Sequence, residues 1–290
     1  MVGALRFGPS GRLVISDEVS AFQPASDEFR DLYSSALDRR RLRKFGSNSD
    51  VDQAQSQDIW EGSSVAAPNN FLYPGFLQTA EKLRAVSSSN DDAVGGLGAW
   101  SVELQPHDEN FNWLQNENQR ISIELNGTTL SSLTSGSFIR MTRGQAKGVG
   151  TYANGNVTGS NVGNIQILTE SGILVGYISA GQTNTKLGIM TVPRGWDFFL
   201  QVITIGISDQ QPADIEVFAR TAANVVTAPF SERQDLFTFV GVQGSARPFE
   251  LEADGLKFPE YTDIWSRVTA GSNDTTARVE LRGLMLRHSA

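Results

Sequence analysis

Residues 191–208, TVPRGWDFFLQVITIGIS, decide how we interpret the rest of the sequence. The β-branched pair Thr191 and Val192 leads into a Pro-Arg-Gly corner at 193–195, and a long apolar run follows. Proline fixes φ for such a turn, and Gly195 can adopt a positive φ without a steric cost. The stretch therefore predicts a strand, a tight turn and a second strand.

The run after the corner predicts a strand that is buried on both of its faces. Alternation places Phe198, Leu200, Val202 and Thr204 on one face and Phe199, Ile203, Ile205 and Ile207 on the other, with Gly206 interrupting the first. Because both faces are largely apolar, we expect this strand in the middle of a β-sandwich. The stretch contains no catalytic motif.

Composition narrows the class of protein further. The chain has 290 residues, which fits one large β domain with an extension or two ordinary domains. No apolar run approaches the roughly 18 residues of a membrane span, and the start MVGALRFG lacks the regions of a secretory signal. The absence of cysteine excludes disulfides, thiolate metal sites and cysteine nucleophiles. The net charge of −8 argues against a protein that coats nucleic acid.

The N-terminal region predicts an arm, residues 1–58, with one amphipathic helix over about 26–45. Apolar residues recur in this helix at i, i+3, i+4, i+7 and i+8, which places them on one face. They are Phe29, Leu32, Tyr33, Ala36 and Leu37. Basic residues 39–44 before Gly46 suit the negative end of the helix dipole. Residues 4–7 and 13–15 around a Pro-Ser-Gly turn predict a small hairpin, and the polar residues 47–56 predict a flexible link.

The basic run of the arm has three interpretations. It comprises Arg39, Arg40, Arg41, Arg43 and Lys44. A solvated helix end is favoured over nucleic-acid binding, because the patch is single and the chain is acidic. A third interpretation is a basic plug that docks on an acidic protein surface. A lone amphipathic helix cannot bury its stripe by itself, so Phe29, Leu32, Tyr33 and Leu37 must pack on this chain or on a neighbour.

From residue 59 onward the pattern is that of a turn-rich β protein, which we assign to one sandwich domain, 59–290. Short apolar runs predict strands at 82–87, 99–105, 120–125, 137–142, 164–169, 173–179, 186–192, 198–207, 213–220, 236–241, 262–268 and 277–286. Turn sequences such as Asn126-Gly127 separate them. The predicted fold is mainly β, an antiparallel jelly-roll sandwich.

No constellation of residues predicts catalysis, a cofactor or a metal. His107, followed by Asp108 and Glu109, lies in a polar loop that favours a solvated turn, because a metal site needs three or four converging ligands. Asp91 and Asp92 are assigned to turn chemistry. Among the tryptophans, Trp113 and Trp196 lie near turns and are the candidates for surface, subunit or glycan contacts.

The β region resembles jelly-roll virion proteins of tailed bacteriophages from about residue 79 to the C-terminus. The resembling pieces are EKLRAVSSS at 81–89, GGLGAW at 95–100, LNGTT at 125–129, TVPRG at 191–195 and FPEYTDI at 258–264. They are turn and strand phrases, so no functional residue is carried over.

The resemblance implies a non-enzymatic structural part of a virion, made in the host cytoplasm. The expected protein is a capsid cement (decoration) protein on the capsid surface, a homotrimer whose partner is the major capsid protein, with no small-molecule substrate. The alternative is a neck, tail or host-attachment protein that binds a receptor glycan. A carbohydrate-active sandwich is a third hypothesis, for which no acid/base pair is identifiable.

Overall fold

The fold is built of β-strands throughout the described part of the chain. The computed structural model describes residues 6–7, 13–14, 39–53, 55–65, 72–114, 121–150, 159–208, 212–244, 247–251 and 255–288. No residue in these ranges is helical, and every pair of named strands is antiparallel. The predicted mainly β, antiparallel class is therefore confirmed, whereas the jelly-roll connectivity stays a prediction.

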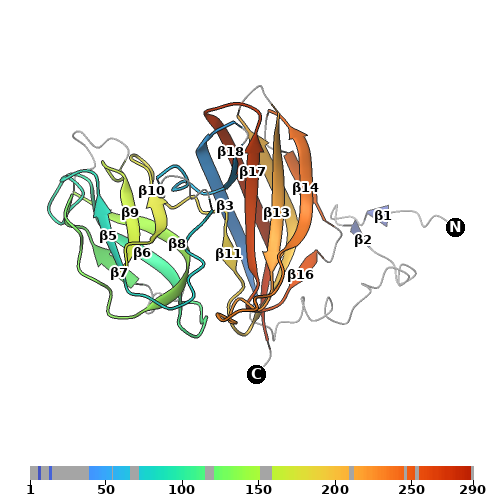
Figure 1. Cartoon of the computed structure of the whole chain (residues 1–290), viewed down its shortest axis with the longest axis horizontal. Coiled ribbons are helices and arrows are strands. Elements are labelled where there is room, and N and C mark those ends of the chain that lie inside the picture. The colour runs from blue at the N-terminus through green and yellow to red at the C-terminus, as the bar shows by residue number, and fades with distance from the viewer. Residues whose placement is uncertain are drawn as a thin grey trace.

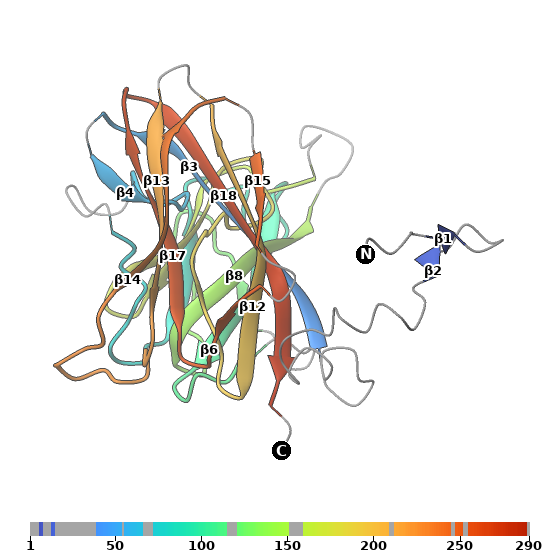
Figure 2. The same cartoon turned by 90° about the vertical axis from the view of Figure 1, so that its right-hand side faces the viewer.

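The strands gather into two lobes that lie side by side in Figure 1, apart from a small N-terminal hairpin. The hairpin pairs β1 (Arg6–Phe7) with β2 (Leu13–Val14), as the sequence predicted. Figure 2 looks onto the larger lobe, with the smaller lobe behind it.

The larger lobe is a sandwich of two sheets. Sheet I has the order β15-β12-β18-β3, with β16 also paired to β12; sheet II has the order β11-β17-β13-β14, with β4 also paired to β17. The strands of sheet I are β3 (Arg39–Val51), β12 (Trp196–Ile207), β15 (Arg247–Glu250), β16 (Leu256–Phe258) and β18 (Thr275–Arg287). Those of sheet II are β4 (Ser56–Asp58), β11 (Met190–Thr191), β13 (Ala213–Arg220), β14 (Gln234–Val242) and β17 (Asp263–Ala270).

Strand β12 enters sheet I through the predicted corner. Gly195 has φ +76°, and the Trp196 amide donates to the Pro193 carbonyl at 3.2 Å, which closes the turn. The strand differs from the expected alternation because its pairing with β18 shifts between Leu200 and Val202. The extra residue of this bulge reverses the parity of the side chains that follow.

The bulge explains why the sequence pattern indicated two apolar faces. The core between the sheets receives Trp196, Phe198 and Leu200 before the bulge and Ile203, Ile205 and Ile207 after it. The opposite face carries a small separate cluster of Phe199, Leu284 and Leu286. One face of β12 thus fills the core, and the strand is central, with β18 on one side and β15 and β16 on the other.

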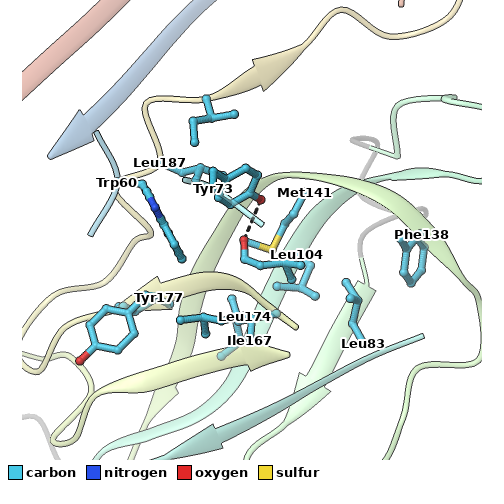
Figure 3. Close-up of a cluster of buried hydrophobic side chains, with 14 of the residues drawn as sticks. Trp60, Tyr73, Leu83, Leu104, Phe138, Met141, Ile167, Leu174, Tyr177 and Leu187 are labelled. Atoms are coloured by element: carbon cyan, nitrogen blue, oxygen red, sulfur yellow. Dashed lines mark hydrogen bonds between the residues drawn. The ribbon is translucent and has the colours of Figure 1, made fainter. Parts of the chain in front are cut away.

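The smaller lobe packs two three-stranded sheets around a second core. Sheet III has the order β7-β6-β8 and sheet IV the order β10-β9-β5. Their strands are β5 (Leu83–Ser87), β6 (Ala99–Asp108), β7 (Ile121–Glu124), β8 (Phe138–Val149), β9 (Ile165–Thr169) and β10 (Leu174–Ile178). Figure 3 shows part of this core, where Trp60, Tyr73 and Leu187 join side chains from the sheets. Asp92 is fully buried and anchors a turn by accepting from Ser87, Ala99, Val162 and Gly163.

The helix predicted over 26–45 is wrong for residues 39–45, the part of it that the structure describes, because these residues belong to β3. This strand pairs with nearly the whole length of β18, from Arg39 opposite Leu286 to Val51 opposite Thr275. Ladder pairing and burial of Leu42 outweigh the weak local preference of a basic run for a helix end. The stripe Phe29, Leu32, Tyr33 and Leu37 lies outside the described residues and stays a prediction.

The predicted flexible link at 47–56 is also wrong in its described part. Ser47–Val51 completes β3 and Ser56 begins β4, while the buried Asn48 amide donates to Gln57 Oε1 at 3.0 Å. Polar residues are ordered here because partners in the fold satisfy them. The division into an arm, 1–58, and a domain, 59–290, stays a prediction as a boundary.

Candidate functional site

A cleft with a volume of about 580 Å³ lies between the two lobes. One wall is β3 of the larger lobe, and the other is formed by β6, β8 and the segment that leads to β11. The lining residues are Leu42, Arg43, Lys44, Phe45, Gln105, Trp113, Thr142, Arg143, Gln182, Thr183, Asn184, Thr185 and Lys186. Four of these are basic and none is acidic.

On the β3 wall, Lys44 points into the junction and Arg43 points to the exposed face. Lys44 is buried, and its ammonium donates to the Thr142 carbonyl of β8. Burial, followed by the nearby Arg143 charge, lowers the pKa of Lys44 to about 7. Arg43 pairs with Glu280 of β18, so its charge is compensated. Within the described part of the chain, the acceptor for Lys44 is the neutral Thr142 carbonyl alone.

On the opposite wall, Lys186 has a carboxylate partner and Arg143 has a neutral one. The Lys186 ammonium lies 3.1 Å from Glu61 Oε1, which also accepts from Ser179 Oγ at 2.6 Å. Arg143 donates twice to the Asn184 side-chain carbonyl, at 2.6 and 3.2 Å. The amide is neutral, and Arg143 has no carboxylate partner among the described residues. The cleft therefore carries uncompensated positive charge at Lys44 and Arg143.

Below the cleft, His107 is buried at the end of β6, so the expectation of a solvated turn is wrong for this residue. Its Nε2 is 3.1 Å from Thr142 Oγ1. The carbonyl of the same threonine accepts the hydrogen bond from Lys44. Burial and then the Arg140 charge lower the pKa of His107 to about 3. A neutral imidazole is therefore a structural part of the junction.

The two candidate tryptophans are brought together, but not on an open surface. Their ring centroids lie 6.3 Å apart at 80°, an edge-to-face arrangement, and the Arg40 guanidinium lies 5.5 Å from the Trp196 ring. Trp196 is only 7% exposed and belongs to the core of the larger lobe, so it packs inside this chain. Trp113 is half-buried and lines the cleft.

A buried ionic network fixes the two lobes against each other. Asp263 of β17 is fully buried and accepts two bonds from Arg140 of β8, both at 3.2 Å. It also accepts from Arg220 at 2.8 Å and from Thr191 Oγ1 at 2.6 Å. Arg140 donates further to the Leu77 and Ile139 carbonyls. The walls of the cleft are thus held by a saturated polar cluster rather than by a flexible joint.

The second candidate surface is the outer face of sheet I. The register of β3 with β18 puts Arg39, Arg41, Arg43, Arg278 and Arg282 on this face, and all five are exposed. Phe45, 39% exposed, lies on the same face. The basic run predicted for a helix end is therefore split by strand alternation, with Arg40, Leu42 and Lys44 pointing inward.

The remaining chemistry is sparse in the part of the chain that the structure describes. Within it, no group of three or more His, Asp or Glu residues is arranged to hold a metal ion. No helix in the described ranges is long and apolar enough to cross a membrane. The cleft residues Gln105, Arg143, Asn184 and Lys186 were missed by sequence reasoning, because they come from three separate segments and no spacing marks them.

Comparisons with known proteins identify no family. No family model matches the chain, and no curated protein matches it significantly. Among solved structures, one of the infectious bursal disease virus Gt strain is 8% identical in sequence and has a TM-score of 0.22. The match covers 88% of this chain and 74% of that chain. T=1 particles derived from infectious bursal virus give 10% identity and a TM-score of 0.23, with 88% and 71% covered. Values this low carry no inference about function.

Proposed function

We propose that this chain is a non-enzymatic structural protein of a virion that docks on the capsid shell through the outer face of sheet I. The observation that carries the proposal is the gathering of five exposed arginines on two neighbouring strands of an acidic chain. The resemblance of the β region to jelly-roll virion proteins of tailed bacteriophages supports the assignment to a particle. The finer role is that of a cement protein on the phage head.

The charge of this face is unusual for a protein with a net charge of −8. The register adds Lys257 on β16 to the five arginines, and the acidic residues that it places on this face within the described ranges are Asp197, Glu250 and Glu280. An excess of positive charge remains. Such a face steers association with an acidic surface and rejects basic ones.

The shape of the face favours a protein partner over a nucleic acid. It is a sheet surface with a half-exposed aromatic ring, Phe45, among arginines, and arginines and aromatic rings are the side chains that dominate protein interfaces. Nucleic-acid binding would need a longer basic stripe. Repetition over a capsid lattice, with the chain as a homotrimer, would convert weak docking into stable attachment. The N-terminal residues before Arg39 would add contacts to neighbouring subunits.

The proposal is tested by binding purified protein to capsids that lack it. The double variant Arg41→Glu with Arg278→Glu should weaken binding about 10-fold or more, because two attractive charges become repulsive. Raising the ionic strength should weaken the native interaction as well. Arg194→Glu with Arg247→Glu makes the same change of net charge on exposed residues away from this face and serves as the control.

Two results would contradict the proposal. One is a stable 31.5 kDa monomer that does not bind such capsids. The other is equal loss of binding in the two double variants, which would mean that total charge rather than this face is recognised.

A further inference from the structure

We propose that the cleft between the lobes binds a short anionic carbohydrate, a sugar that carries a carboxylate or sulfate group. This site adjoins the capsid-docking face, with which it shares Arg43 and Phe45, and its ligand goes beyond the proposed structural role. It also departs from our expectation of a protein without a small-molecule ligand.

The charge distribution of the cleft favours an anionic ligand. Arg43 and Lys186 have carboxylate partners in Glu280 and Glu61, but Arg143 and Lys44 are held by a neutral amide and a neutral carbonyl. Arg143 is exposed and solvated, whereas Lys44 is buried, so the charge of Lys44 is the one that burial and the nearby Arg143 disfavour. A bound carboxylate or sulfate would accept from Arg143 and offset the repulsion between the two cations.

The polar groups around these cations suit the hydroxyl groups of a sugar. Gln105 comes from β6, and Gln182 and Asn184 come from the segment between β10 and β11. An amide offers a donor and an acceptor side by side, and vicinal sugar hydroxyls can satisfy both. Thr183 adds a hydroxyl, and the half-buried Trp113 adds an apolar ring against which the C–H face of a sugar can pack.

The size and rigidity of the cleft also fit a short oligosaccharide. Its volume of about 580 Å³ lies within the range of roughly 300–1,000 Å³ that is usual for small-ligand sites. The Arg140–Asp263 pair fixes the walls, and a close approach of Gly46 to Gly188 fixes β3 against the loop that carries Lys186. A site held in this way needs little reorganisation when a ligand binds.

The cleft is concave and carries three side-chain amides, so it suits a different ligand from the protein partner proposed for the docking face. An acidic protein surface could meet the exposed arginines of sheet I, but it could not enter a cleft of this size without inserting a segment. A nucleic acid would need more phosphate contacts than two uncompensated cations provide. The observations therefore favour a small acidic sugar.

The test is calorimetric titration of the full-length protein with matched sugars. Sialyllactose, sulfated lactose and a hyaluronan tetrasaccharide are the acidic probes, and lactose and inorganic sulfate supply the neutral core and the free anion. We expect at least one acidic sugar to bind, and lactose and sulfate each to bind at least about 10-fold more weakly. Arg143→Gln should reduce the affinity about 10-fold or more, because it removes a charge-assisted bond.

The control variant is Arg278→Gln, which removes an exposed arginine outside the cleft and should leave sugar binding unchanged. Far-ultraviolet circular dichroism and the melting temperature show whether each variant is folded. Because the docking face and the cleft respond to different variants, failure of sugar binding would leave capsid docking standing, and the reverse also holds.

Lys44 should make the sugar affinity of the cleft depend on pH, which non-specific attraction to surface arginines would not do in this range. The charged groups nearest to it in the cleft are Arg143 from β8 and Lys186 on the opposite wall, whereas its neighbour Arg43 points to the outer face; neutral Thr142 and His107 lie beneath. Since Lys44 is protonated only below about pH 7, affinity for the acidic sugar should fall as the pH rises through this value. Lys44→Met should bind more weakly at pH 6 and lose this dependence.

Several results would overturn the proposal. They are the absence of binding by all acidic probes at millimolar concentration, equal affinity for lactose and sialyllactose, affinity of inorganic sulfate equal to that of the sugars, or unchanged affinity in a folded Arg143→Gln variant. Binding of an acidic peptide in place of every sugar would likewise refute the carbohydrate assignment.

Discussion

Replacing Asp263 by asparagine perturbs the junction between the lobes at its centre. The carboxylate is fully buried and compensates two cations, Arg140 and Arg220, while also accepting from Thr191. Asparagine has nearly the same shape, so packing is retained and the change is electrostatic. Arg140 is only 5% exposed and would remain charged and buried without a counter-ion.

The magnitude follows from the burial of that unpaired charge. Removing one partner of a buried ion pair typically destabilises a protein by about 3–5 kcal/mol. Arg140 keeps its bonds to the Leu77 and Ile139 carbonyls, so we expect a loss near the lower end, about 3 kcal/mol. Because this network joins the lobes, the variant should also separate the unfolding of the two lobes into distinct transitions.

Urea unfolding followed by tryptophan fluorescence and by circular dichroism measures both effects. The matched control is Asp235→Asn, which breaks the Arg233–Asp235 pair, 3.1 Å long and exposed at 45% and 58%. Its cost should stay within about 0.5 kcal/mol, as expected for a surface pair. An Asp263→Asn variant that unfolds in one transition, with a loss no larger than that of the control, would refute the electrostatic account of the junction.

Two further predictions concern acid stability and backbone packing. His107 is neutral in the fold down to about pH 3, whereas an unfolded histidine takes up a proton below about pH 6.5, so the fold should lose on the order of 1 kcal/mol per pH unit between these values. His107→Gln should lose less stability over that interval in pH-dependent urea unfolding, and an unchanged slope would contradict the assignment. Gly46→Ala places a Cβ 2.3 Å from the Gly188 Cα and should lower stability by about 1–3 kcal/mol. Gly136→Ala meets only the edge of the Phe138 ring at 3.2 Å and should cost less in thermal unfolding; equal losses would refute the close-approach argument.

Local signals in the sequence predicted most of the strands. The Pro193 to Gly195 corner and the hairpin before residue 15 depend on neighbouring residues, so they could be recognised without the fold. Strand β3 could not, because its strongest determinant is pairing with β18, more than two hundred residues away. Tertiary pairing decided the structure of a basic run whose own preference is weak.

The same limit explains the errors at the candidate sites. The bulge near Gln201 reverses the faces of β12, and alternation in the sequence carries no mark of it. Trp196 follows a turn, which made it a candidate for surface or subunit contacts, and Trp113 and Arg40 lie against its ring. The cleft joins residues from β3, β6, β8 and the segment before β11, so its excess of positive charge exists only in three dimensions.

The most direct test of the proposed role is an electron cryomicroscopy reconstruction of the particle that contains this chain. The account predicts density for the two-lobed molecule on the head, with the outer face of sheet I, and Arg41 and Arg278 in particular, against the shell. A particle whose head carries no such density, or in which this arginine face points to solvent, would contradict the account.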